Sequence, residues 1–206
     1  MTEWKLFDKE PPETEQYLAE RCRMGLRMQP GFMQRARMVV DLVKLSIIVG
    51  GYTSVTDLGC GDGELLTMMP PENVAKSWGY ELGKSDVQYG IRRGLDVRQA
   101  NIVTGSCRLE YGEIVVISEV LEHLADPRSL LKSLPDLRLV IASSPSLETA
   151  EWHNESHAWA WDLDGYRDLF KDCGYNVLYQ NDSDGGINSF DGAVGEQRFQ
   201  VIVAMR

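Results

Sequence analysis

Cysteine is scarce in this sequence, and no two cysteines are spaced as a metal-binding or redox pair. The four cysteines, Cys22, Cys60, Cys107 and Cys173, are scattered and never form a Cys-x-x-Cys motif. This spacing argues against a zinc ribbon, a redox dithiol and a disulfide framework. Because scattered thiols are typical of a reducing compartment, we expect a cytoplasmic protein.

Long hydrophobic runs are also missing. A membrane span needs roughly 18 uncharged apolar residues, and no stretch reaches that length. The best candidate, residues 39–49, is interrupted by Asp41 and Lys44. Residues 1–8 lack the basic start and apolar run of a signal peptide. We therefore expect no membrane partner.

Basic side chains are outnumbered, with 21 Lys and Arg against 31 Asp and Glu and a net charge of −10. Residues 21–44 are the exception, with six basic side chains and one acid, whereas residues 145–206 hold eleven acids and four bases. Phosphate neutralisation supplies most nonspecific affinity for nucleic acid, so the overall charge disfavours RNA as a partner. Only residues 21–44 could receive an anionic partner, and a solvated helix face explains the same charges.

The 206 residues, 43% of them hydrophobic, are enough for one domain with a substantial core. Helices are predicted over residues 14–28 and 33–49, the second ending at Gly50-Gly51. We interpret residues 1–50 as an N-terminal helical cap that is part of the same domain.

Beyond the cap, β-rich runs alternate with helix-compatible stretches, which predicts an α/β fold with a parallel sheet covered on both faces. The predicted strands are residues 54–58, 78–82, 95–100, 114–118, 137–143, 176–180 and 199–205, with a helix over 163–173. Residues 181–198 are polar and rich in glycine, and they are predicted to form a long loop between the last two strands.

Residues 55–63, Val-Thr-Asp-Leu-Gly-Cys-Gly-Asp-Gly, place a strand directly before three glycines spaced by two. Glycine permits sharp bends and the close approach of a ligand. A dinucleotide fingerprint would need glycine at position 64, which is Glu64, and a phosphate-binding P-loop would need Gly-Lys-Ser/Thr. The spacing disfavours a nicotinamide oxidoreductase; a tight turn without a ligand is the structural alternative.

A second cluster of reactive side chains follows the fourth predicted strand. In a helical turn, Glu119, Glu122 and His123 would share one face, and His157 lies further along the chain. Carboxylates and imidazole can bind Mg²⁺ or Mn²⁺. His123, with Glu122 beside it, could equally act without metal as a general base, since an unperturbed imidazole has a pKa of about 6.5.

The pattern Asp57-x-Gly-x-Gly-x-Gly resembles the first motif of the class I S-adenosylmethionine-dependent methyltransferases, and the resemblance extends over about residues 52–206. It implies a Rossmann-like sheet of seven mostly parallel strands with an antiparallel last strand, a methyltransferase domain over residues 51–206 and a helical cap over the cofactor cleft. The cofactor's methionyl end is zwitterionic, so a carboxylate at Asp57 suits its ammonium group.

By the same resemblance, Glu81 accepts the ribose hydroxyls, and Asn101 stands where the family usually has an acid beside the adenine amine. The implied cofactor-binding residues are Asp57, Gly59, Cys60, Gly61, Glu81, Leu82, Asn101, Ile102, Ser118 and Glu119. The implied donor is S-adenosyl-L-methionine.

The Glu-x-x-Glu-His cluster resembles those of the ubiquinone-pathway O-methyltransferases and the small-RNA 3′-end 2′-O-methyltransferases. This second resemblance implies a metal site of Glu119, Glu122, His123 and His157. The sequence departs from it at Ser144-Pro145-Ser146, where Thr-Pro-Asn is usual. We expect a methyltransferase acting on an oxygen or nitrogen of a small molecule. The alternatives are a metal-dependent RNA 2′-O-methyltransferase and a non-catalytic S-adenosylmethionine-binding module.

Overall fold

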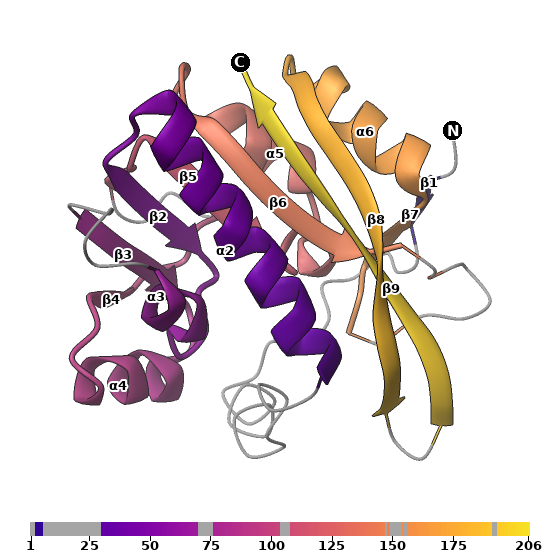
Figure 1. Ribbon diagram of the computed structural model, residues 1–206, viewed down its shortest axis with the longest axis horizontal. Helices are drawn as coiled ribbons and strands as arrows, with labels where there is room; N and C mark the ends of the chain where they lie inside the picture. Colours follow the sequence, from indigo (N-terminus) through magenta and orange to yellow (C-terminus); the bar gives the residue numbers. More distant parts are fainter. Residues whose placement is uncertain are drawn as a thin grey trace.

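The computed structural model describes residues 3–5, 30–69, 76–103, 108–146, 148, 154, 156–190 and 193–206. Its centre is a seven-stranded sheet in the order β4-β3-β2-β5-β6-β9-β8 (Figure 1). The strands are β2 (Ser54–Leu58), β3 (Lys76–Glu81), β4 (Val97–Gln99), β5 (Ile114–Ser118), β6 (Leu139–Pro145), β8 (Asn176–Phe190) and β9 (Ala193–Met205). A separate pair joins β1 (Glu3–Lys5) to β7 (Trp159–Trp161).

Strands β2 to β6 pair in parallel, and β9 runs antiparallel between β6 and β8. The predicted Rossmann-like sheet with an antiparallel last strand is thereby confirmed. From β2 the chain builds outward through β3 and β4, then returns to place β5 on the other side of β2. This reversal opens a crevice at the carboxyl ends of β2 and β5, where ligands of open α/β sheets bind.

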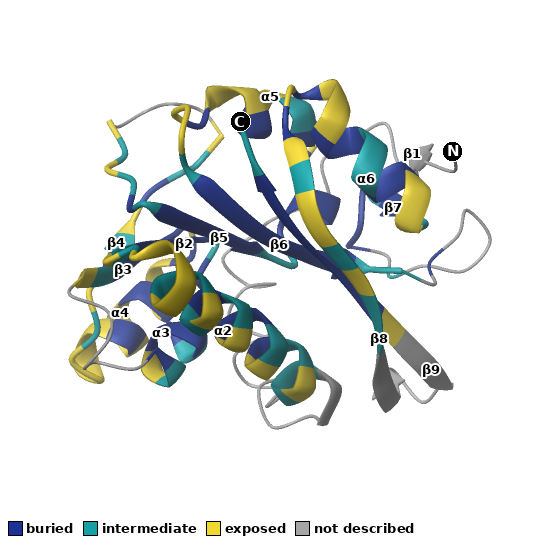
Figure 2. Cartoon of the chain, turned by 45° about the horizontal axis from the view of Figure 1, so that its top comes forward, coloured by how far each residue is buried: buried dark blue, intermediate teal, exposed yellow. Residues whose placement is uncertain are grey.

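Helices cover both faces of the sheet (Figure 2). On one face lie α2 (Pro30–Gly50), α3 (Glu64–Met68) and α4 (Lys84–Arg92), and on the other lie α5 (Pro127–Ser133) and α6 (Leu163–Asp172). Because β5 lies at the centre of a sheet that is covered on both faces, its residues 114–117 are all apolar and fully buried.

The long helix α2 forms because its small and branched apolar residues recur at helical spacing. Ala36, Val39 and Val43 are buried against β2, β5 and β6. Pro30 is its first residue, a position where a missing N–H costs nothing. The helix predicted over residues 33–49 is therefore confirmed, whereas the one predicted over 14–28 lies outside the described residues. Of the helices in the described ranges, none has the length and apolar character that a membrane crossing requires.

The loop predicted over residues 181–198 is wrong. Strands β8 and β9 continue through most of it, with paired residues from Asn176 and Met205 to Phe190 and Ala193. Glycine and polar side chains lower local strand propensity, but a ladder of backbone hydrogen bonds between two strands overrides it. The pair β1–β7 was not predicted either, because its two strands lie far apart in the chain.

Gln200 is a buried polar link between the sheet and the short strand β7. Its side-chain amide donates to the carbonyl of Trp161 at 3.0 Å, and it is fully buried in β9. A buried carbonyl without a hydrogen bond destabilises the fold, because nothing compensates for its desolvation. The hydrogen bond from Gln200 therefore stabilises the position of β7 on the sheet.

Replacing Gln200 with methionine, which keeps the length but removes the donor, should lower the free energy of unfolding by about 1–3 kcal/mol. Urea denaturation followed by circular dichroism would measure it. Gln99→Met is the matched control, because Gln99 also donates to a backbone carbonyl, that of Leu82 at 3.2 Å, but at an exposed site. Equal losses in Gln200→Met and Gln99→Met would contradict the assigned role of Gln200.

Candidate active site

The glycine loop joins β2 to α3 and needs glycine for two different reasons. Gly59, Gly61 and Gly63 all have left-handed backbone angles, with φ of 72°, 55° and 83°. A Cβ on Gly59 would lie 2.5 Å from a methyl group of Val120, whereas one on Gly61 would meet nothing within 4 Å. Gly61 therefore presents an open backbone edge, the geometry that lets a ligand approach closely.

Four backbone N–H groups of this loop already have acceptors within the protein. Gly59 and Cys60 donate to one carbonyl at the end of β3, at 2.8 and 3.1 Å. Gly61 donates to Glu81 Oε2 at 2.9 Å, and Gly63 donates back to the carbonyl of Cys60 at 3.0 Å. These donors cannot also bind a phosphate, which agrees with the sequence argument against a dinucleotide.

Asp57, next to the last residue of β2, has a buried carboxyl group. Its Oδ2 is inaccessible to solvent and has no hydrogen-bond partner. Burial, and then the charge of Glu81, raise the pKa of Asp57 from 3.8 to about 8. A buried carboxyl in this state is stabilised by a cation, and an ammonium group would supply both the charge and the missing hydrogen bond.

Glu81 is held rigidly at the end of β3. Its Oε2 accepts from Gly61, and its Oε1 accepts from the N–H of Gly83 at 2.8 Å. A carboxylate oxygen can accept more than one hydrogen bond, so a ligand hydroxyl could share this carboxylate with the two backbone donors. Asn101, which is expected to lie beside the adenine amine, already makes a hydrogen bond within the protein. Its Oδ1 accepts from the N–H of Val103 at 2.9 Å.

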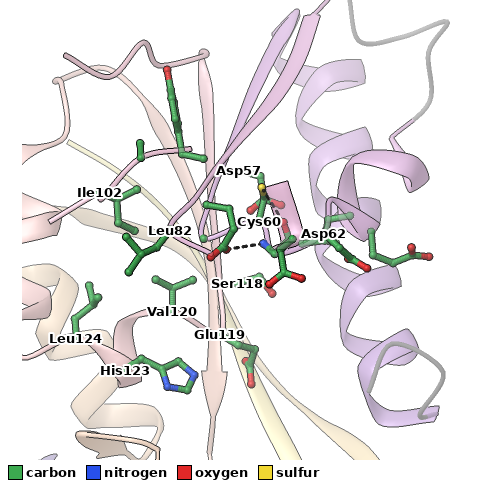
Figure 3. Close-up of a pocket in the computed structure, with 18 of the residues that line it drawn as sticks. Asp57, Cys60, Asp62, Leu82, Ile102, Ser118, Glu119, Val120, His123 and Leu124 are labelled. Carbon is green, nitrogen blue, oxygen red and sulfur yellow. Dashed lines mark hydrogen bonds between the residues drawn. The ribbon is translucent and has the colours of Figure 1, made fainter. Parts of the chain in front are cut away.

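One pocket at the carboxyl ends of β2, β3 and β5 is lined by all ten residues that the sequence assigned to the cofactor (Figure 3). His123 lines it too; Glu122 and His157 do not. Leu82 and Ile102 lie toward one end, and Glu119 and His123 lie toward another. Sequence reasoning did not assign twelve further lining residues, among them Phe32, Arg35, Asp62, Asp86, Val120 and Leu124.

Glu119 does not share a helical turn with Glu122 and His123, so that expectation is wrong. Its N–H donates to the carbonyl of Ser143 at 3.1 Å, which continues the β5–β6 ladder, and the 3₁₀ turn η2 (Leu121–His123) starts only afterwards. Glu119 has a left-handed φ of 56°, which is strained for a residue other than glycine. Such strain is typical of functional sites, and here it accompanies a side chain that lines the pocket.

Behind Glu119, the side chains of Glu122, His123 and His157 place one potential ligand atom each within 4.8 Å of the others. His123 Nδ1 lies 3.0 Å from the carbonyl of Ser156, so Nδ1 must be the donor. His157 Nδ1 lies 2.6 Å from a carboxylate oxygen of Glu148. In both rings, when neutral, these contacts favour the tautomer with its lone pair on Nε2.

Glu122 is fully buried, and neither of its carboxyl oxygens has a hydrogen-bond partner. Burial, followed by the negative charge of Glu119, raises its pKa well above the usual range. Together with Nε2 of His123 and His157, this carboxyl could bind a divalent cation. Glu119, the fourth predicted ligand, is not part of this group.

Glu148 was missed because nothing in its local sequence marks it. Arg35 had a signal, since it lies in the basic segment over residues 21–44. Its Nη1 lies 3.2 Å from Glu119 Oε2, which forms an ion pair inside the pocket.

A family model described as "Methionine biosynthesis protein MetW" matches residues 39–152, more than half of the chain. No curated protein matches the sequence. Among solved structures, the N-methyltransferase NodS from Bradyrhizobium japonicum is 15% identical, with a TM-score of 0.67 over 93% of this chain and 97% of that one.

Two further solved structures share the fold. Magnesium protoporphyrin IX methyltransferase from Synechocystis is 16% identical, with a TM-score of 0.60 over 88% of this chain and 87% of that one. The [4+2]-cyclase SpnF is 12% identical, with a TM-score of 0.64 over 83% and 80%. These likenesses identify the fold as that of the class I methyltransferases, a fold that also carries other chemistry.

The buried carboxyl of Asp57 predicts how stability depends on pH. Since its pKa is higher in the folded state, the folded protein holds a proton that the unfolded chain loses between about pH 4 and about pH 8. This contribution to stability is full below about pH 4 and is lost as the pH rises through about 8.

Asp57→Asn removes that dependence. The stability of the variant relative to the wild type should therefore grow by at least about 1 kcal/mol between about pH 5 and about pH 9, as measured by urea denaturation without ligand. A difference that stays constant with pH would contradict the raised pKa of Asp57.

Proposed function

The chain belongs to the family described as methionine biosynthesis protein MetW, and from that premise and the pocket geometry we propose that it is an S-adenosylmethionine-dependent methyltransferase. The observation that carries the proposal is the buried, unpartnered carboxyl oxygen of Asp57, beside the open backbone edge of Gly61. A cofactor whose reacting end bears an ammonium and no phosphate suits both features.

The rest of the pocket supports the same ligand. Glu81, fixed by two backbone donors, would accept the ribose hydroxyls, and Leu82 and Ile102 would contact the adenine. Ser118 and Glu119 would lie along the methionyl chain. Cys60 would contribute only packing, because burial raises the pKa of its thiol well above 9.

When bound, the cofactor supplies a methyl group on a positively charged sulfonium, which becomes a neutral thioether on transfer. The chain must then align an acceptor oxygen or nitrogen with that methyl group and remove its proton. We assign proton removal to His123 Nε2, because its Nδ1 is held by the carbonyl of Ser156. Glu122, whose backbone carbonyl accepts from Ala158 at 2.7 Å, would position His123 within the turn.

We assign a small-molecule acceptor. The net charge of −10 disfavours RNA, and among the described residues that line the pocket six carboxylates stand against one arginine. Two structural neighbours, the N-methyltransferase NodS and magnesium protoporphyrin IX methyltransferase, are methyltransferases, and the second is named for a small-molecule acceptor.

Isothermal titration calorimetry with S-adenosylhomocysteine tests the cofactor assignment. Because Asp57 must ionise to pair with the ammonium, binding should release a proton, and the affinity should rise by up to about tenfold per pH unit below about pH 8. Asp57→Asn should weaken binding by about 10- to 100-fold and reduce its pH dependence.

Titration with NADH is the control for ligand class, and no binding is expected. Binding of NADH without binding of S-adenosylhomocysteine would exclude the proposed cofactor. A chain that binds the homocysteine product but transfers no methyl group to any acceptor would be a non-catalytic cofactor-binding module.

A metal-assisted reaction is the second candidate, and the grouping of Glu122, His123 and His157 favours it. The three side chains are of the types that bind such an ion, since the unpartnered Glu122 carboxyl and two oriented imidazoles are suitable ligands for Mg²⁺ or Mn²⁺. A bound ion would hold acceptor oxygens and make a hydroxyl more acidic.

Transfer assays with and without a chelator distinguish the two candidates. For a metal-free base, activity should persist in EDTA, His123→Ala should lose about 10²- to 10⁴-fold in rate, and His157→Ala should be much milder because His157 does not line the pocket. Loss of activity in EDTA, restored by Mg²⁺ or Mn²⁺ and accompanied by equal losses in both variants, would instead establish the metal-assisted reaction.

A further inference from the structure

The outer face of α2 is apolar, although it points away from the sheet. The inner face packs on the sheet through buried residues such as Val39 and Val43. On the outer face, Leu45, Ile48 and Val49 leave 57%, 73% and 78% of their surface exposed (Figure 2). A helix that is apolar all round is normally covered all round, and exposed apolar patches mark interaction sites. The outer face of α2 therefore indicates a surface that another molecule covers.

A groove lies on this face, where α2 meets β8. Tyr179 of β8 lines it and is 42% exposed. Two rows of α2 side chains also line it, each with a spacing of four residues, namely Met33, Arg37, Asp41 and Leu45 in one row and Gln34, Met38 and Leu42 in the other. Side chains four residues apart form the ridges through which helices pack into the grooves of other helices. The surface thus suits a second helix.

The row of Met33, Arg37, Asp41 and Leu45 is complementary to itself. In either direction it consists of an apolar end, two opposite charges and an apolar end. Two such rows can meet antiparallel about a two-fold axis midway between residues 37 and 41. Arg37 of each copy then faces Asp41 of the other, and Leu45 faces Met33. Every charge meets the opposite charge, and every apolar end meets an apolar end.

Both charged side chains of this row are accessible. Arg37 is exposed and has no ion-pair partner among the residues that the structure describes. Asp41 pairs with Lys44 of the same helix at 3.6 Å, and its side chain is 73% exposed. Such an exposed ion pair contributes little, so Asp41 can take a second cation. An acidic partner would be repelled by Asp41 and a basic one by Arg37, whereas a second copy pairs both.

We propose that the chain forms a two-fold symmetric dimer in which the groove of each copy receives α2 of the other. The dimer does not depend on the proposed reaction, but it acts on the same helix, because Phe32, Arg35 and Ala36 of α2 line the cofactor pocket. The second copy would hold that wall of the pocket in place from outside. Since an isologous contact closes after two copies, no larger assembly forms through this face.

Sedimentation velocity on the full chain tests the dimer. The wild type should approach twice the chain mass of 23.2 kDa as its concentration rises to about 100 μM. Arg37→Asp and Asp41→Arg each place like charges opposite each other, and each should raise the dissociation constant of the dimer by at least about tenfold. The double variant exchanges the signs of both pairs and should dimerise within about threefold of the wild type. Arg92→Asp, which reverses an exposed arginine on α4 outside the groove, is the matched control and should leave the dimer unchanged.

Three results would overturn the proposal. A wild type that stays monomeric at about 100 μM would leave the groove to a different protein or to another segment of the chain. Dimers of full strength in both single variants would place the contact on another face. Weakened dimers in the single variants without recovery in the double variant, when circular dichroism shows a native fold, would exclude the antiparallel pairing of Arg37 with Asp41.

Discussion

The carboxyl group of Asp57 is buried without a full set of hydrogen bonds, and the rest of the site is arranged around that cost. It lies at the end of β2, the strand on either side of which the sheet is built, so β3 and β5 flank it. Glu81 on β3 adds a second negative charge nearby, which raises the pKa of Asp57 further. Two neighbouring carboxyl groups repel each other when both are ionised and no ligand is bound. A bound cation removes this repulsion, so the pocket favours a positively charged ligand.

The two glutamates that follow β5 have separate tasks because the sheet ends between them. Glu119 still belongs to the β5–β6 ladder through its N–H and also receives a hydrogen bond from Ser143 Oγ at 3.1 Å. Its left-handed backbone then redirects the chain into η2. Glu122 is consequently enclosed behind the pocket, next to the two histidines, while Glu119 lines it. One strained residue thus separates a carboxylate that lines the pocket from a buried one.

Features set by neighbouring residues could be predicted from the sequence, and features set by distant contacts could not. The strand before Asp57, the glycines after it and helix α2 depend on local periodicity and backbone angles, and the structure has them where they were predicted. The β8–β9 pair was predicted only over residues 176–180 and 199–205, because the polar, glycine-rich composition of residues 181–198 lowers strand propensity and does not show the ladder that overrides it. The β1–β7 pair joins residues far apart in the chain, and composition gave no signal for it. Arg35 and Glu148 act through contacts with residues distant in sequence.

Fold alone does not determine the reaction, since a [4+2]-cyclase shares it with methyltransferases. What separates the possibilities is the chemistry of the acceptor side. A [4+2] cyclisation forms its bonds without moving a proton, so it has no use for oriented imidazoles. Here His123 and His157 are each held through Nδ1, by a carbonyl and by a carboxylate respectively. Keeping Glu122 buried and unpaired beside them costs stability, and natural proteins retain such groups mainly where chemistry uses them. The cluster therefore favours a reaction that removes a proton, as methylation of a hydroxyl or an amine requires.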